Sequence, residues 1–204
     1  MKSEILPMEF SELDEKIYAG FWRRFGAFWV DFFIVIPVSI GIVYINNLGR
    51  LNLLYTLFPS YVFFFIYHIY FVKLWGATPG KIITKIKIIR SDGLSLGWKE
   101  AFLRHIIQFV LGILAAIALS IPLINMTDVE FSSMSFMEQQ RLMIQLAPFW
   151  YKFVHWSNNI WIWSEFIVLL INKRKRALHD YVAGTVVIKK KHENLAEQWY
   201  LKNQ

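Results

Sequence analysis

A nearly uncharged run from Gly26 to Ile45 constrains the fold more than any other feature of this sequence. Its only charged side chain is Asp31, which stands among aromatic and aliphatic residues. About 20 residues in a helix, at ~1.5 Å each, span the ~30 Å hydrocarbon core of a bilayer. The run therefore predicts a membrane-spanning helix, which we place at about residues 20–45.

The composition agrees with a membrane protein. Hydrophobic residues make up 56% and aromatic residues 18% of the 204 positions, and aromatic rings favour the membrane interface. The chain has no cysteine, so disulfides and thiolate metal sites are excluded. A net charge of +7 could indicate nucleic-acid binding, but no nucleic-acid motif is present. We expect the basic loops to contact anionic lipid headgroups instead, and we expect no nucleic-acid partner.

Three further apolar segments are predicted to span the membrane beside the first one. They lie at about residues 53–75, 102–124 and 149–172, with a polar excursion at 125–148 between the last two. The final segment is the weakest, because it carries Lys152, His155 and Glu165. Lysine and arginine concentrate between the second and third segments and after the fourth, so the positive-inside rule places both termini in the cytoplasm. The predicted fold is an all-α membrane protein, a bundle of four transmembrane helices.

Two short segments read as strands rather than helices. Polar and apolar residues roughly alternate over 82–89, and residues 185–190 have a second strand pattern. Either strand alone would leave unpaired backbone groups, so we predict that they form a small two-stranded cytoplasmic sheet. We place a membrane domain at 18–190, between a cytoplasmic tail (1–17) and a basic tail (191–204).

The two polar segments outside these elements also suggest local structure. From Met8 onward the N-terminal tail could form a short amphipathic helix or stay unstructured. In the excursion, Ser135 and Glu138 have the spacing of a capping box, which predicts a short helix on the far side of the membrane.

Three linked motifs resemble the RDD family of membrane proteins, named for one arginine and two aspartates. They read AGFWRRFGAFWVD, then GATPGKIITKIKIIRSDG with Arg104 after it, then LHDYVAGTVVI. The resemblance assigns the family arginine to Arg24 and the aspartates to Asp31 and Asp180. Between Asn125 and Asn159 the sequence departs from the pattern of the family. A transport role has been suggested for the family, and some members have been linked to sodium/proton antiport.

Four polar side chains fall at a similar predicted depth, roughly 10 Å from the cytoplasmic end of each helix. We expect them to form one polar layer, either a closed lock or a proton and cation site; they are Asp31, His68, Gln108 and Glu165. An intramembrane carboxylate is costly, and cost alone does not separate a functional role from a structural one. Asp31 could therefore be either a proton or cation site or a structural carboxylate that holds helices together.

The cytoplasmic motifs suggest further contacts. Arg24 could bind an anion, but we favour an interfacial anchor and ion-pair partner. Asp180 is expected to be the counter-ion of Arg24 or Arg104. The other residues of this basic and turn motif are Thr78, Gly80, Lys81, Gly184 and Thr185. The turn at Thr78–Lys81 lacks the spacing of a phosphate-binding loop.

The histidines carry no helical metal-binding spacing, and no nucleophile, base and acid combine. We expect no metal, no cofactor and no enzyme activity. Two functions remain: a small transporter or cation/proton exchanger of the bacterial inner membrane, expected as a homodimer because four helices enclose little space, or a membrane scaffold with structural polar residues. The sequence does not identify a transported ligand.

Overall fold

The computed structural model describes residues 5–8, 10 and 15–203, and it is mostly helical with one small antiparallel sheet. Its first half contains α1 (Phe21–Asn47), α2 (Asn52–Phe65), the π-helical turn η1 (Ile66–Tyr70), α3 (Phe71–Trp75), α4 (Pro79–Ile83), β1 (Ile86–Arg90) and α5 (Trp98–Leu103). The second half contains α6 (Ile106–Asn125), α7 (Asp128–Ser133), α8 (Phe136–Leu146), α9 (Tyr151–Ile171), α10 (Leu178–Val182), β2 (Thr185–Lys189), η2 (Lys190–His192) and α11 (Glu193–Lys202).

Within the described residues, three helical segments are long and apolar enough to cross a membrane: Phe21–Asn47, Asn52–Ile83 and Ile106–Asn125. They correspond to the first three predicted spans. The third expected span is interrupted, because the chain turns at Arg104 and His105 between α5 and α6. A helix of 21 residues, α9, also forms where the fourth span is predicted. Because of its polar residues, α9 is less apolar than these three segments and is not one of them.

The chain divides into two compact units. Unit 1 comprises residues 1–34, 65–106 and 162–204, and unit 2 comprises residues 35–64 and 107–161. Each of the four boundaries falls inside a long helix.

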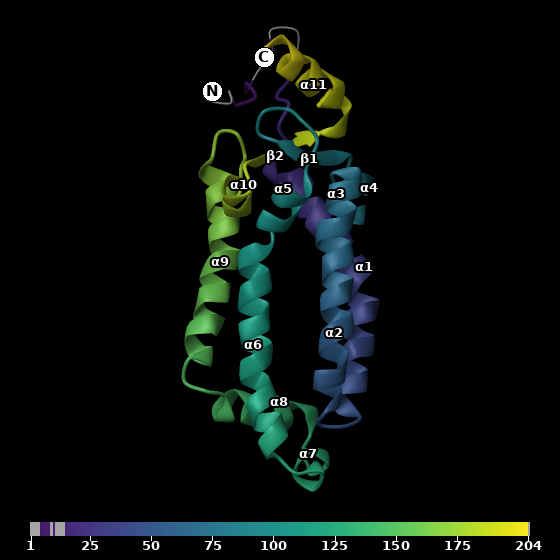
Figure 1. Cartoon of the computed structure of the whole chain (residues 1–204), viewed down its shortest axis with the longest axis vertical. Coiled ribbons are helices and arrows are strands. Elements are labelled where there is room, and N and C mark those ends of the chain that lie inside the picture. The colour runs from purple at the N-terminus through teal and green to yellow at the C-terminus, as the bar shows by residue number, and fades with distance from the viewer. Residues whose placement is uncertain (1–4, 9, 11–14, 204) are drawn as a thin grey trace. The chain divides into compact units, whose positions relative to one another are not determined.

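The sheet of unit 1 confirms the predicted pairing of the two strand-like segments. β1 and β2 run antiparallel from Ile86 opposite Lys189 to Arg90 opposite Thr185 (Figure 1). The predicted strand boundaries were too wide, because Ile82 and Ile83 belong to α4 and Lys190 begins η2. Pro79 starts α4 at the position where proline favours a helix.

Chain segments from both ends of the sequence complete this unit. Tyr18 bridges Ile188, and the N–H groups of Ala19 and Lys189 donate to Val187 and Ile17, each at 2.9 Å, so the outer edge of β2 is covered. Helix α11 lies beside the strands (Figure 1). At Gly93, with a φ of +100°, an added Cβ would stand 2.5 Å from the carbonyl oxygen of Ala196. The possible helix from Met8 falls largely outside the described residues.

Unit 2 contains the two short helices α7 and α8 after the end of α6 (Figure 1). The predicted capping box is confirmed, since the N–H and hydroxyl of Ser135 both donate to Glu138. A second box, at Thr127 and Glu130, opens α7 and was not predicted. The apolar core of the unit is a cluster of Leu123, Met126, Phe131 and Met143.

Candidate polar site

Asp180 is the most deeply buried charged group of unit 1, with none of its surface exposed. Arg24 donates through Nη1 to its Oδ2 atom at 2.8 Å, and Arg104 pairs with Oδ1. The N–H of Ala177 donates to Oδ2 at 2.9 Å, across the first turn of α10. The prediction of a counter-ion role is confirmed, and both candidate arginines take part rather than one.

The electrostatics of this group follow from its two cations. Burial raises the pKa of the Asp180 carboxyl, but the charges of Arg104 and Arg24 outweigh burial and hold that pKa well below its usual range. The turn before β2 adds a further contact, because Arg104 donates to the Thr185 hydroxyl at 2.5 Å. Gly184 makes this turn with a φ of +64°, a conformation that glycine adopts without strain.

Asp31, the other family aspartate, is surrounded by uncharged donors. The hydroxyls of Tyr67 and Thr78 donate to its two carboxylate oxygens at 2.6 Å each, and the Gly80 N–H donates at 2.7 Å. Lys81 lies further away, with Nζ 3.9 Å from Oδ2. The turn at Thr78–Lys81 therefore binds a carboxylate of the same chain, the Asp31 side chain of α1.

Gly80 makes this approach sterically feasible. A Cβ at that position would stand 2.4 Å from the Ala27 carbonyl oxygen and 2.7 Å from the Asp31 side chain. Real Cβ atoms do not approach other atoms so closely, so glycine is required for the turn to meet α1.

Three histidines from distant parts of the sequence lie in a row: His68 of η1, His105 of the turn between α5 and α6, and His179 of α10. The ring centroids of His68 and His105 are 5.1 Å apart, and those of His105 and His179 are 6.5 Å apart with nearly parallel planes. Glu165 of α9 ends the row, since it pairs with the His179 ring through Oε2 and accepts the His179 backbone N–H through Oε1 at 3.1 Å. Burial, and then the charge of Arg104, lower the pKa of His179.

The π-helical turn η1 links the row to the aspartate site. It presents Tyr67 to Asp31 and His68 to His105 from adjacent positions. Such turns insert one residue into a helix and are common at functional sites. Sequence reasoning identified His68 but missed Tyr67, His105 and His179 as members of this site. No shared periodicity marks them, and their position near helix ends is the only signal they carry.

The four residues of the predicted polar layer are divided between the two units. Asp31, His68 and Glu165 all belong to this unit, but the hydrogen bonds of the two carboxylates go to different partners. Gln108 is an exposed residue of α6 in unit 2. A single layer of all four side chains remains a prediction.

The charges in these contacts balance. Each carboxylate has a basic side chain within ion-pair distance, and with neutral histidines the three cations of these pairs cancel the three anions; the six residues are Arg24, Lys81, Arg104, Asp31, Glu165 and Asp180. The buried Arg176 adds one further positive charge beside them, since it donates to the carbonyls of Asp180 at 3.0 Å and Thr185 at 3.1 Å. Three buried side-chain donors lack a hydrogen-bond partner in the described part of the chain: Nη2 of Arg24, Nε of Arg104 and Nε of Arg174. Across residues 5–8, 10 and 15–203, no group of three or more acidic or histidine side chains is arranged to hold a metal ion.

Comparison with known proteins identifies the family. Curated proteins and solved structures give no significant match. Residues 18–184 match the RDD family, which is most of the chain and includes Arg24, Asp31 and Asp180. The chain therefore belongs to the RDD family.

Proposed function

We propose that this protein is a multi-pass protein of the bacterial inner membrane that exchanges protons for cations through the polar site of unit 1. The observation that carries the proposal is the row of three histidines ending on Glu165, beside a charge-balanced group of ion pairs. Imidazoles and carboxylates in contact can pass a proton between them, because each changes the charge of its neighbour.

Balanced charge supports coupling between the proton and a second cation. With the histidines neutral, the six ion-paired residues have no net formal charge and the buried Arg176 lies beside them, so a bound proton adds positive charge to a poorly hydrated site that has no spare anion among its described residues. A cation at the same site would add the same charge. Each ion therefore disfavours the other, which is the energetic requirement for exchange.

The two carboxylates then have different roles. Asp31 accepts three short hydrogen bonds from fixed donors, so it serves as a structural anchor for the turn before α4. Glu165 pairs with a titratable ring and is the carboxylate that takes part in proton exchange. This assignment differs from the sequence-based emphasis on Asp31.

The membrane orientation proposed here has four spans and both termini in the cytoplasm. It is supported by the distribution of lysine and arginine and by the length of α9, which at 21 residues can cross the hydrocarbon core. Reporter fusions at Asn47 and Ser133 should read as extracytoplasmic. A cytoplasmic signal at Ser133 would exclude the fourth span.

The proposed partners follow from this placement. Anionic headgroups would contact the basic segments at 173–176 and 189–191, and a second copy of the chain would complete a pathway that four helices enclose poorly. We propose neither a nucleic-acid partner nor an enzymatic reaction. Crosslinking in native membranes tests the dimer, and its failure would leave a monomeric pathway to be explained.

A scaffold function is the second candidate, and one observation favours it. Asp31 has its hydrogen-bonding capacity met by Tyr67, Thr78 and Gly80, as expected for a residue that only holds helices together. In this case the histidine row would be structural as well.

Transport by purified protein in liposomes separates the two candidates. Proton flux should be measured against a panel of alkali and divalent cations, for wild type, Glu165→Gln and the matched control Glu138→Gln, whose carboxylate caps α8 in unit 2. Exchange should fall at least tenfold in Glu165→Gln and stay near wild type in the control. Properly folded protein with no flux for any cation would exclude exchange and leave the scaffold.

A further inference from the structure

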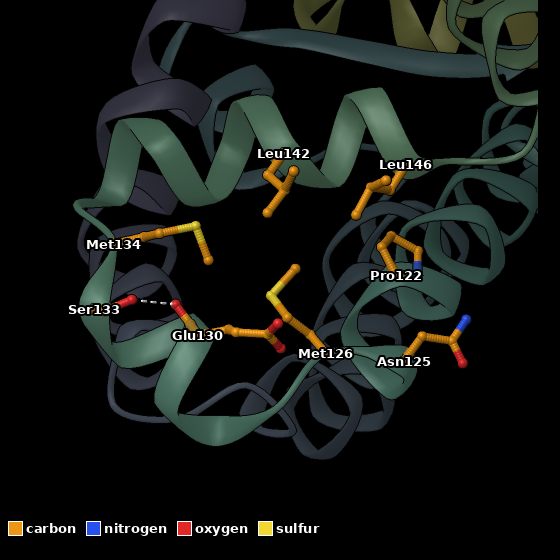
Figure 2. Close-up of a pocket in the computed structure, with 8 residues that line it drawn as sticks. All are labelled: Pro122, Asn125, Met126, Glu130, Ser133, Met134, Leu142 and Leu146. Carbon is orange, nitrogen blue, oxygen red and sulfur yellow. Dashed lines mark hydrogen bonds between the residues drawn. The ribbon is translucent and has the colours of Figure 1, made fainter.

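Unit 2 contains a cavity of its own, with a volume of about 300 Å³. Figure 2 shows the eight residues that line it: Pro122, Asn125, Met126, Glu130, Ser133, Met134, Leu142 and Leu146. We propose that this cavity binds an organic monocation with a compact apolar body, such as a quaternary ammonium compound. This inference is independent of the proton exchange proposed for unit 1.

The walls of the cavity suit an apolar body. Met126 and Met134 extend their thioethers into it from one side, and Leu142 and Leu146 face it from one side of α8 (Figure 2). Apolar lining with a few polar groups is typical of small-molecule sites, and this volume is at the small end of their range. Methionine side chains are flexible and polarisable, so they adapt to ligands of differing shape.

Glu130 gives the cavity its charge. It is the only ionisable side chain among the eight lining residues. Its Oε2 atom accepts both the N–H and the hydroxyl of Thr127, each at 2.8 Å. The hydrogen bonds from Thr127, first of all from its backbone, lower the pKa of this carboxyl, so it is ionised at neutral pH.

The nearby cation of the unit is already engaged. Arg50 donates to Asp128 at 2.6 Å and to the Leu123 carbonyl at 3.0 Å. Asp128 is thereby neutralised, while Glu130 forms no ion pair within the described residues. One negative charge beside an apolar wall is complementary to a cation that also carries apolar surface.

The same features argue against other ligands. Calcium and magnesium prefer several oxygen ligands with more than one carboxylate among them, and here the polar lining residues are one carboxylate, Glu130, and the uncharged Asn125 and Ser133. An anion would be repelled by Glu130. A purely apolar molecule would fit the walls but would not gain from the carboxylate.

Several contacts hold the cavity open before a ligand arrives. The capping boxes at Thr127 and Ser135 fix the starts of α7 and α8, and the Ser133 hydroxyl donates to the Glu130 carbonyl at 2.9 Å (Figure 2). Phe131 and Met143 anchor the same helices in the core of the unit. A preformed site binds more tightly, since less ordering has to accompany binding.

Calorimetry on the full chain in lipid nanodiscs tests the proposal with benzyltrimethylammonium as the probe. Because Glu130 is exposed, its charge should contribute modestly, and Glu130→Gln should weaken binding by about three- to fivefold. Glu138→Gln is the matched control, because Glu138 makes the same capping box on α8 without lining the cavity. It should change the affinity by less than about twofold.

A second variant tests the cavity itself. Leu142→Trp places a larger side chain in the space and should abolish binding. Neopentylbenzene, the neutral analogue of the probe, should bind equally well to wild type and to Glu130→Gln. Binding of the cation that is unchanged in both Glu130→Gln and Leu142→Trp would overturn the proposal, because it would reflect partitioning into the lipid. Equal weakening by Glu130→Gln and Glu138→Gln would also overturn it.

Discussion

The two units differ in how their polar residues are used. In unit 1 the central ion pairs join distant parts of the sequence, with 156 positions between Arg24 and Asp180 and 76 between Arg104 and Asp180. In unit 2 the capping boxes join residues only three positions apart. The contacts of Arg50 resemble those of unit 1 in span, but its ion pair with Asp128 is exposed. Unit 1 thus adds buried long-range charges to its apolar clusters, whereas unit 2 combines its apolar cluster with local caps.

This difference has an energetic consequence. A buried ion pair is costly to break on one side, because the remaining charge stays desolvated. An exposed pair contributes little, because water and salt replace it. Equivalent substitutions should therefore have unequal effects in the two units.

The largest effect is expected from Asp180→Asn. Removing this charge leaves Arg24 and Arg104 buried beside a neutral group, which should cost about 3–5 kcal/mol of folding free energy. Asp128→Asn is the matched substitution in unit 2, where the side chain is 82% exposed, and it should cost less than about 1 kcal/mol. Unfolding by detergent titration measures both. Equal losses would show that the two units do not differ in this way.

The double contact of Asp180 also revises a simpler test. If Arg24 and Asp180 formed an isolated pair, exchanging the two residues would restore the pair and rescue the protein. Here Arg104 contacts the same carboxylate, so an arginine at position 180 would face another arginine. We therefore expect Arg24→Asp combined with Asp180→Arg to remain as unstable as Asp180→Asn.

A smaller difference is expected between two glycines. Gly80→Ala should destabilise the protein by about 1–3 kcal/mol, because its Cβ would overlap Ala27 and Asp31. At Gly41, in the unit 2 part of α1, an added Cβ would meet no other atom within 4 Å. Gly41→Ala should be neutral or stabilising by up to about 1 kcal/mol, since alanine favours a helix. Thermal unfolding in the same detergent compares them, and a stable Gly80→Ala protein would contradict the tight contact.

Sequence reasoning succeeded where one physical requirement left few solutions. Two isolated strands needed partners, and they pair with each other. A carboxylate in a basic segment needed a counter-ion, and Asp180 contacts both predicted arginines. The spacing of Ser135 and Glu138 predicted a cap that is present.

It was less successful where tertiary contacts decide. The partners of Asp31 come from η1 and the turn before α4, and hydroxyl and backbone donors leave no charge pattern in the sequence. The neighbouring histidines lie in η1, in the turn between α5 and α6, and in α10, so no helical period connects them. Alternation also mispredicted residues 82–83 as strand, because the start of a helix at Pro79 overrides a short pattern.

The smallest effect is expected from acid at Glu15, which lies in a partly exposed charge cluster that joins it to the end of β2 and to η2 in unit 1. Glu15 pairs with Lys189 at 2.6 Å and with Lys191, and it contacts His192 at 2.9 Å. Hydrogen bonds from Lys189 and then Lys191 lower the pKa of Glu15 to about 2, from 4.5 in the unfolded chain. A lowered pKa means that the cluster stabilises the fold above about pH 4.5 and loses this contribution as the pH falls toward 2. Glu15→Gln should therefore be less stable than wild type at pH 7, and the difference should vanish in acid and shrink at high salt. A difference between the two proteins that stays constant from pH 7 to acid would show that Glu15 acts through packing rather than charge.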